Sequence, residues 1–358
     1  MESFENSATT SISALGEFGL IDHLTKNITI HNKSTKLGVG DDCAIVAYPK
    51  NEILISTDIM VEDVHFDLTY TPLKHLGYKA AMTNFSDICA MNGIPKQITI
   101  GIALSSKYSL EAVEEIYAGI ILACNKHKVD IVGGDTTSSK KGLFLSITVI
   151  GEAKKNTVAF RNGAKENNLI CVTGDLGAAF MGLQILEREK QVFLAAPGTQ
   201  PDLEGKDYIL ERFLKPEARL DIIASFEKIG LVPTSMIDIS DGLASELLHI
   251  CKSSEKGCTI YEEKIPIDQL TYETAREFNL DPTVCALNGG EDYELLFTID
   301  QKDYEKIKTD PNITVIGFIS ENKDACNLIS KSETIHPLTA QGWNHMRNND
   351  NEQNASLN

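Results

Sequence analysis

The chain has 358 residues, and at roughly 100–200 residues per domain this length suggests two domains. Hydrophobic residues make up 42% of the sequence and charged residues 23%, which excludes a fibrous or fully disordered chain. The net charge of −18 disfavours nucleic acid and anionic membranes as partners, because such a surface repels phosphate backbones. A phosphorylated substrate remains compatible with this charge, since metal ions can bridge carboxylates and phosphates.

Targeting signals and disulfides are not expected. No apolar run approaches the roughly 20 residues that span a bilayer, and the first ten residues lack the basic and apolar regions of a signal peptide. The eight cysteines include no CxxC pair, and a chain of this length needs no disulfides. We therefore expect a cytoplasmic protein whose reduced cysteines pack as small hydrophobic side chains.

The first half alternates predicted helices and strands. Ser109 precedes the longest helical pattern and is its expected N-cap. Residues 37–46 are typical of a Gly-rich turn between extended segments. Helices are predicted at residues 15–26, 72–91 and 110–128, strands at 97–104 and 143–153, and a strand followed by a turn at 129–137.

The second half repeats this alternation after a polar stretch at residues 154–168. We expect an α/β (α+β) chain with an N-terminal domain at residues 1–155, a C-terminal domain at 156–343 and a disordered polar tail at 344–358. Helices are predicted at 178–189, 216–228 and 242–251, a strand leading into a turn at 168–177, strands at 236–239, 294–299 and 313–319, and a surface loop at 191–207.

Hydrophobic runs in both halves end in small residues followed by aspartate. Each aspartate alone is typical of a turn or a helix cap, but several brought together would repel one another unless divalent cations neutralise them. Mg²⁺ prefers oxygen ligands and is usually shared with substrate phosphates, whereas no Cys or His pair has the spacing of a zinc site. The aspartates are Asp41, Asp42, Asp58, Asp87, Asp135, Asp238 and Asp241.

Glycine pairs and a few cationic residues add candidate phosphate contacts. Gly133-Gly134 and Gly289-Gly290 permit either a tight turn or close approach of a phosphate. Arg161 could hold phosphate oxygens, and His65 a phosphate or hydroxyl, although a linker charge and a structural histidine are equally ordinary interpretations. The Walker A loop, protein-kinase motifs and Gly-x-Ser-x-Gly elbow are absent from the sequence.

Seven segments occur in one order along the chain. They are LGVGDDCA from Leu37, STD at 56–58 with His65-Phe66, NFSD at 84–87, GGDTT at 133–137, Arg161-x-Gly-Ala, Asp238-x-Ser-Asp241-Gly, and GGEDYEL at 289–295. Through these segments the chain resembles the thiamine-monophosphate kinases, a family of the aminoimidazole ribonucleotide synthetase superfamily. The resemblance runs from about Gly16 to Trp343.

The resemblance implies a two-domain fold, with an N-terminal mixed sheet covered by helices and a C-terminal α/β domain. It implies ATP and thiamine monophosphate as substrates, several Mg²⁺ ions, and a homodimer that pairs through its N-terminal sheets. The implied metal ligands are Asp42, Ser56, Thr57, Asp58, Asp87, Asp135, Asp238 and Asp241. The implied catalytic residues are Asp41, Asp42, Asp58 and Asp87; Gly134, Asp135, Arg161 and Ser240 would bind ATP, and His65, Glu291 and Trp343 the thiamine phosphate.

The expected reaction is direct in-line phosphoryl transfer that gives thiamine diphosphate. Other chemistry of the superfamily stays open: an ATP-dependent ligase or synthetase for a purine precursor, or a selenophosphate synthetase. A metal-dependent phosphohydrolase could use the same aspartates to activate water, and a non-catalytic metal-binding protein would bind the ions without turnover.

Overall fold

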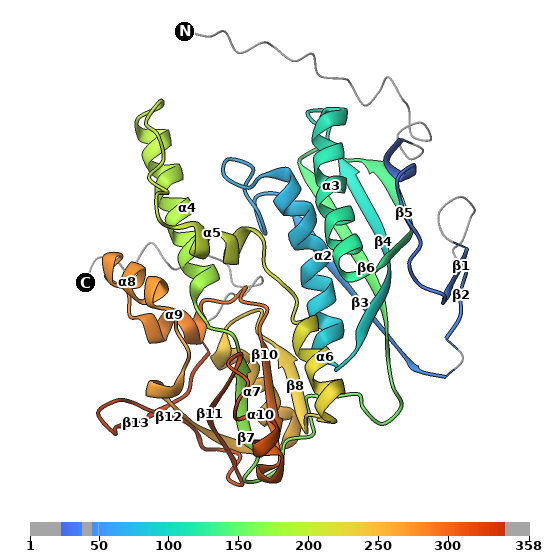
Figure 1. Ribbon diagram of the computed structural model, residues 1–358. Helices are drawn as coiled ribbons and strands as arrows, with labels where there is room; N and C mark the ends of the chain where they lie inside the picture. Colours follow the sequence, from blue (N-terminus) through green and yellow to red (C-terminus); the bar gives the residue numbers. More distant parts are fainter. Residues whose placement is uncertain (1–22, 38–44, 49, 341–358) are drawn as a thin grey trace.

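The computed structural model describes residues 23–37, 45–48 and 50–340 (Figure 1). Most of the helix predicted at residues 15–26, the Gly-rich turn and the polar tail lie outside these residues. β1 (Thr35–Leu37) pairs antiparallel with β2 (Ile45–Val46). Within the described residues, none of the helices could serve as a membrane-spanning segment.

The N-terminal half contains a mixed four-stranded sheet in the order β3-β6-β4-β5. β4 and β5 pair in parallel and the other neighbours are antiparallel. Alternate side chains of β6 are buried, and α2 and α3 cover that face of the sheet (Figure 1). The elements are β3 (Glu52–Val61), α2 (Leu73–Ala90), β4 (Ile94–Leu104), α3 (Leu110–His127), β5 (Asp130–Ser138) and β6 (Leu143–Ala153).

The C-terminal half contains a seven-stranded sheet in the order β13-β12-β9-β11-β7-β10-β8, within the described part of the chain. Its strands are β7 (Leu169–Thr173), β8 (Ser235–Asp238), β9 (Gly257–Tyr261), β10 (Leu295–Ile299), β11 (Ile313–Ser320), β12 (Cys326–Ile329) and β13 (Ile335–Pro337). Its helices are α4 (Ala178–Ala195), α5 (Asp207–Leu214), α6 (Leu220–Ile229), α7 (Leu243–Ser254), α8 (Gln269–Glu277), α9 (Pro282–Asn288) and α10 (Tyr304–Ile307). The expected α/β (α+β) architecture is confirmed.

Several predicted elements match the structure closely. Helix α3 begins where Ser109 accepts a hydrogen bond from the backbone N–H of Ala112 at 3.3 Å, as its sequence indicates. Strand β6 has the predicted bounds. The boundary placed at residue 155 falls in the connection between β6 and β7.

Three local predictions are wrong. The chain does not turn at Gly133-Gly134, because β5 continues to Ser138 while pairing with β4. A Cβ at Gly134 would lie 2.1 Å from the carbonyl oxygen of Ile100, so this glycine serves close strand approach. The loop predicted at 191–207 begins late, since α4 runs to Ala195, and the helix predicted from residue 216 begins only at Leu220.

Helix α2 is the central element of the molecule, and most of its 18 residues are buried. One side packs on the first sheet and α3. Another side faces the second domain, and side chains such as Phe226 of α6 and Met236 of β8 share one hydrophobic core with it. The two domains are therefore joined by a continuous apolar core as well as by the chain.

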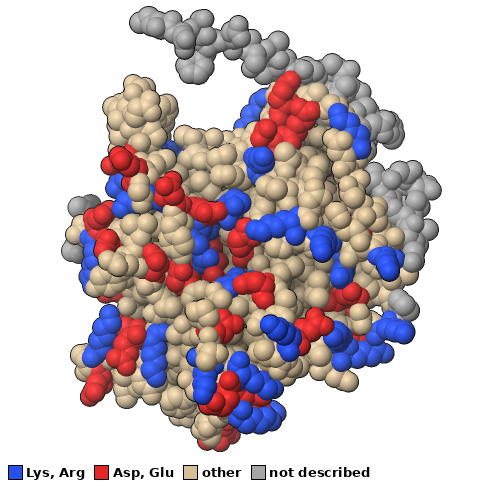
Figure 2. Space-filling view, in the orientation of Figure 1, with Lys and Arg blue, Asp and Glu red and all other residues tan. Residues whose placement is uncertain are grey.

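Polar contacts surround this junction. Glu217, in the segment between α5 and α6, accepts hydrogen bonds from Tyr78 of α2 and Lys126 of α3, each at 2.7 Å. Figure 2 shows acidic and basic side chains interleaved across the middle of the molecule, on the face seen in Figure 1. A cavity of about 390 Å³ opens beside them, lined by Lys126, Glu217 and Arg219 among others.

Two glycines allow α2 and α3 to approach closely. A Cβ at Gly77 would lie 1.9 Å from the carbonyl oxygen of Ile116, and a Cβ at Gly119 would lie 1.9 Å from that of Lys74. Real Cβ atoms do not come so near a backbone oxygen. Any side chain at either position would force the helices apart.

We expect Gly77→Ala to lower the free energy of unfolding by about 3 kcal/mol, the upper part of the usual cost of overpacking a core. Thermal unfolding followed by circular dichroism measures the change. Gly101→Ala is the matched control, because its Cβ would meet nothing closer than 3.6 Å. Equal melting temperatures for the two variants would contradict the tight helix contact.

Candidate active site

A cluster of carboxylates forms where β3 meets α2. The Ser56 hydroxyl donates to Asp87 Oδ2 at 2.5 Å, and the backbone N–H of Asp58 donates to Asn84 Oδ1 at 3.2 Å. Residues 56 and 58 share one face of β3 because side chains alternate along a strand. Asn84 and Asp87 lie about one helical turn apart on α2. Strand and helix therefore present their polar side chains to each other.

The second domain completes the cluster with Asp238 at the end of β8. The Ser86 hydroxyl donates to Asp238 Oδ2 at 2.7 Å, which links α2 to the C-terminal sheet. Burial, with the nearby charge of Asp87, raises the pKa of Asp58 to about 6 and that of Asp238 to about 7. A cation bound beside these two carboxyls would therefore stabilise their ionised forms and lower their pKa values.

Asp87 is the centre of this electrostatic group. Burial raises its pKa, while the hydrogen bond from Ser56 and the positive charge of Arg161 act in the opposite direction. Arg161 follows the first domain, and its exposed side chain is close enough to act on Asp87. A Cβ at Gly163 would lie 1.7 Å from the Thr234 carbonyl oxygen, which explains the glycine in the Arg161-x-Gly-Ala segment.

Glu246 is a site residue that the sequence analysis missed. It lies in the first turn of α7, and its Oε1 accepts a hydrogen bond from the backbone N–H of Asp241 at 3.1 Å. Its Oε2 is buried without a hydrogen-bond partner, and burial raises the pKa of this carboxyl to about 8. A glutamate in the first turn of a helix is so common that the sequence offers no distinctive signal for it.

The turn before β10 brings Glu291 to the buried side of α2. Lys79 is only 4% exposed, and its ammonium lies 2.8 Å from Glu291 Oε2 and 4.0 Å from the centre of the Phe213 ring. The backbone N–H groups of Glu291 and Tyr293 donate to the carbonyl oxygens of Ser240 and Ile239 at 2.7 and 2.9 Å. Both residues have positive φ, 60° and 51°, and these hydrogen bonds hold them there.

The other acids of GGEDYEL have structural partners. Asp292 Oδ2 accepts the backbone N–H of Gly177 at 2.9 Å, at the start of α4. Glu294 is buried between the guanidinium groups of Arg212 and Arg219. Glu294 also lines the cavity at the domain junction, but its charge is already paired with two guanidinium groups.

Some predicted ligands lie apart from the cluster. The Thr57 side chain is on the opposite face of β3, where it donates to the Ile147 carbonyl oxygen at 3.1 Å. Gly134 and Asp135 are on β5, and two strands separate them from β3, a distance of about 14 Å at the usual strand spacing. His65 lies in the turn after β3, where Nδ1 accepts the backbone N–H of Val61 at 3.1 Å.

Three predicted site residues fall outside the described part of the chain. They are Asp41, Asp42 and Trp343. The roles assigned to them stay predictions.

Comparison with known proteins places this geometry in a family. Residues 40–153 match the model of the AIR synthase related protein, N-terminal domain. The thiamine-monophosphate kinase of Bacillus subtilis is 33% identical over 342 residues, which cover 93% of this chain and 100% of that protein. That of Aquifex aeolicus is 32% identical over 93% of this chain and 99% of its own length. The chain belongs to the thiamine-monophosphate kinase family.

Solved structures agree with this membership. The structure of AaThiL complexed with AMPPCP and TMP covers 95% of this chain and 100% of its own, with a TM-score of 0.70 and 31% identity. The thiamine-monophosphate kinase from Stenotrophomonas maltophilia reaches a TM-score of 0.74 at 27% identity, with coverage of 89% of this chain and 97% of its own. The hydrogenase maturation protein HypE, at 17% identity, a TM-score of 0.71 and coverage of 92% of this chain and 98% of its own, shows the shared fold alone.

The carboxylate cluster of this thiamine-monophosphate kinase family member has the donor chemistry that a hard divalent cation prefers. Asp58, Asp87, Asp238 and Glu246 offer oxygen donors only, which Mg²⁺ prefers. The unpartnered Glu246 Oε2 and the raised pKa values of these carboxyls are both costs that a bound cation would remove.

We expect the metal-free protein to lose stability as the pH rises from about 4 to 7, partly through Asp238. Its unfolded carboxyl ionises near 3.8, whereas burial holds the folded pKa at about 7, so the folded state keeps the proton longer. Asp238→Asn should therefore flatten the dependence of melting temperature on pH in the presence of a chelator.

Asp207→Asn, at an exposed position of α5, is the control and should follow the unmodified protein. Parallel curves for all three proteins would show that Asp238 is not held protonated in the fold.

Proposed function

We propose that this protein transfers the γ-phosphate of ATP to thiamine monophosphate, giving ADP and thiamine diphosphate. The observation that carries the proposal is the set of carboxylates from both domains around Asp87, in a chain whose relatives are thiamine-monophosphate kinases. One of those relatives binds AMPPCP and TMP together. The reaction joins two anions, and this site is built to attract positive charge.

The acceptor phosphate needs little chemical activation. Its second pKa is about 6, so at neutral pH it is already a nucleophilic dianion, and no strong general base is required. The chain's task is to bind and align the two substrates in line. Bound Mg²⁺ would supply relief from repulsion between their phosphates.

We assign the chain's own residues accordingly. Asp58, Asp87 and Asp238 would bind the Mg²⁺ ions, and the hydroxyls of Ser56 and Ser86 fix the orientation of two of these carboxylates. We further assign Mg²⁺ binding to Asp42 and Asp241, nucleotide contacts to Gly134, Arg161 and Ser240, and a catalytic position to Asp41. Thr57 and Asp135 lie apart from the cluster, so a role for them as ligands would need a second Mg²⁺ ion.

We assign contacts with the thiamine phosphate to His65, Glu291 and Trp343, and the first two would place it at the domain junction. Support comes from the connection between β3 and α2, which reaches across to α4. Asp67 pairs with Lys190 at 2.6 Å, and the Tyr70 hydroxyl donates to Glu187 at 2.7 Å. The segment that carries His65 is thus tied to the second domain.

The decisive experiment incubates the protein with ATP, Mg²⁺ and thiamine monophosphate and measures thiamine diphosphate by chromatography. Thiamine diphosphate should form with this acceptor and not with free thiamine. Free phosphate without thiamine diphosphate would instead identify a phosphohydrolase.

Asp58→Asn and Asp87→Asn should each lower turnover by at least about a hundredfold, the usual cost of losing one electrostatic group of an active site. Circular dichroism should show that both variants fold. Asp207→Asn should keep the full rate, since this side chain is exposed on α5. Near-normal turnover in the Asp58 and Asp87 variants would contradict the assignment of these residues to the active site.

We also propose a homodimer formed through the uncovered face of the first sheet. Ile53, Ile55 and Ile59 of β3 and Phe144 of β6 expose large apolar side chains there, and Ile55 is 68% exposed. A contiguous apolar sheet face is typical of an interface.

We place this enzyme in the cytoplasm, with support from the free thiols of all seven cysteines that the structure describes.

Ile55→Glu should convert the dimer to a monomer, because it buries a charge in the interface. Light scattering coupled to gel filtration measures the mass. Val284→Glu is the control: Val284 is also an exposed apolar residue, but it lies on α9 of the other domain, so this variant should keep the mass of the dimer. A dimeric Ile55→Glu variant would place the interface elsewhere.

A further inference from the structure

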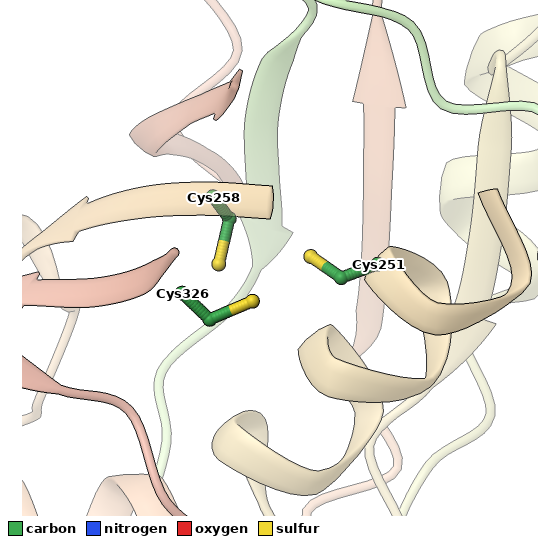
Figure 3. A group of neighbouring side chains, drawn as sticks. All are labelled: Cys251, Cys258 and Cys326. Carbon is green, nitrogen blue, oxygen red and sulfur yellow. The ribbon is translucent and has the colours of Figure 1, made fainter. Parts of the chain in front are cut away.

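Three cysteines converge in the second domain, far apart in sequence. The sulfur atoms of Cys251, Cys258 and Cys326 all lie within 4.8 Å of one another. Figure 3 shows the three thiols pointing toward a common centre, one from the last turn of α7, one from β9 and one from β12. Their spacing along the chain matches no zinc motif, so the sequence alone argued against such a site.

The backbone holds the three positions in place. Cys258 and Cys326 are register partners in the parallel pair of β9 and β12, and the N–H of Cys258 donates to the Ala325 carbonyl at 3.1 Å. The N–H of Lys256 donates to the Cys251 carbonyl at 3.0 Å, in the turn that leads from α7 into β9. The thiols are therefore brought together before any ligand arrives.

The three thiols are open to solvent on one side only, so a ligand could enter from that side. Cys251 and Cys258 are 2% and 0% exposed at the border of a hydrophobic core, whereas Cys326 is partly exposed. Thiolates are the form that binds metals, so a metal ion that enters this group would displace the thiol protons.

Simple core packing would explain one such cysteine. It does not explain why three thiols from three elements face one another. Zn²⁺ binds thiolates at about 2.3 Å in a tetrahedron, which places neighbouring sulfurs about 3.8 Å apart. The sulfurs lie within 4.8 Å of one another, which exceeds this spacing by about 1 Å at most. A group made of thiols alone favours a soft cation.

We propose that Cys251, Cys258 and Cys326 bind one Zn²⁺ ion as three thiolates, with water in the fourth position on the side of Cys326. Binding releases the thiol protons to solvent, so it strengthens as the pH rises. The ion would join α7 to β9 and β12, and through β12 to the last described strand, β13.

The proposed zinc site is separate from the carboxylate cluster. Cys251 is the ninth residue of α7, so about 12 Å of helix lies between it and the start of α7 next to Asp241, and about 7.5 Å between it and Glu246. The zinc ion should therefore stabilise the fold and leave phosphoryl transfer unchanged. This proposal does not depend on the proposed function.

The test uses the full-length, reduced, metal-free protein. Titration with Co²⁺ should produce thiolate-to-cobalt charge transfer and tetrahedral ligand-field bands that saturate at one equivalent, and Zn²⁺ should then displace the cobalt. Competition with a chromophoric chelator gives the zinc affinity. Zn²⁺ should also raise the melting temperature without changing turnover.

Cys326→Ser should weaken zinc binding by more than the 10–100-fold that loss of an outer-shell partner typically costs. Cys285→Ala is the control, since Cys285 is a buried free thiol of α9 outside the group, and it should bind zinc normally. Absence of the charge-transfer bands, or equal zinc affinity in Cys326→Ser and the unmodified protein, would overturn the proposal.

A second measurement needs no variant. Zinc should slow the alkylation of Cys251, Cys258 and Cys326 in the folded protein, read by peptide mass spectrometry after the reaction is quenched and the protein is digested. Cys285 should react equally with and without zinc. Uniform labelling of all four cysteines in both conditions would count against the site even if a variant failed to fold.

Discussion

The burial of helix α2 between two sheets is the constraint on which the rest of the structure depends. A polar side chain on a helix that is covered on several sides must find a partner, because an unpaired buried group costs free energy. Asn84 and Asp87 find theirs on β3, and Ser86 finds its partner on β8. Lys79 reaches the turn before β10. The contacts that dock the domains are thus also the contacts that build the carboxylate cluster.

Local patterns in the sequence were enough to predict many of the helices and strands. The alternation of β6 and the Ser109 cap of α3 depend on neighbouring residues only, and both were predicted. The helical residues 191–195 were missed because the Gly and Pro residues that follow them dominate the pattern. The strands β9 and β12 are five and four residues long and form through partners elsewhere in the chain, which no local pattern reveals.

The candidate site was predictable where the chain marks it. Asp58 and Asp87 follow small residues, Asp238 stands two residues before Ser240, and the structure brings the three together. Ser56 and Thr57 look equivalent in sequence, but the pleat of β3 sends them to opposite faces. Lys79 carries no signal, since its partner Glu291 is 212 positions away. Pairings of this kind become visible only when distant segments are seen in space.

The turn that carries Glu291 and Tyr293 has a practical consequence. Two non-glycine residues with positive φ cost on the order of 1 kcal/mol each, and this strain is carried beside the domain junction. Glycine would relax the backbone at either position, so a search for heat-resistant variants would favour it there. Such variants would lose the carboxylate that meets Lys79, or the buried ring beside it. Thermostability screens of this enzyme should therefore exclude this turn, where robustness and activity oppose each other.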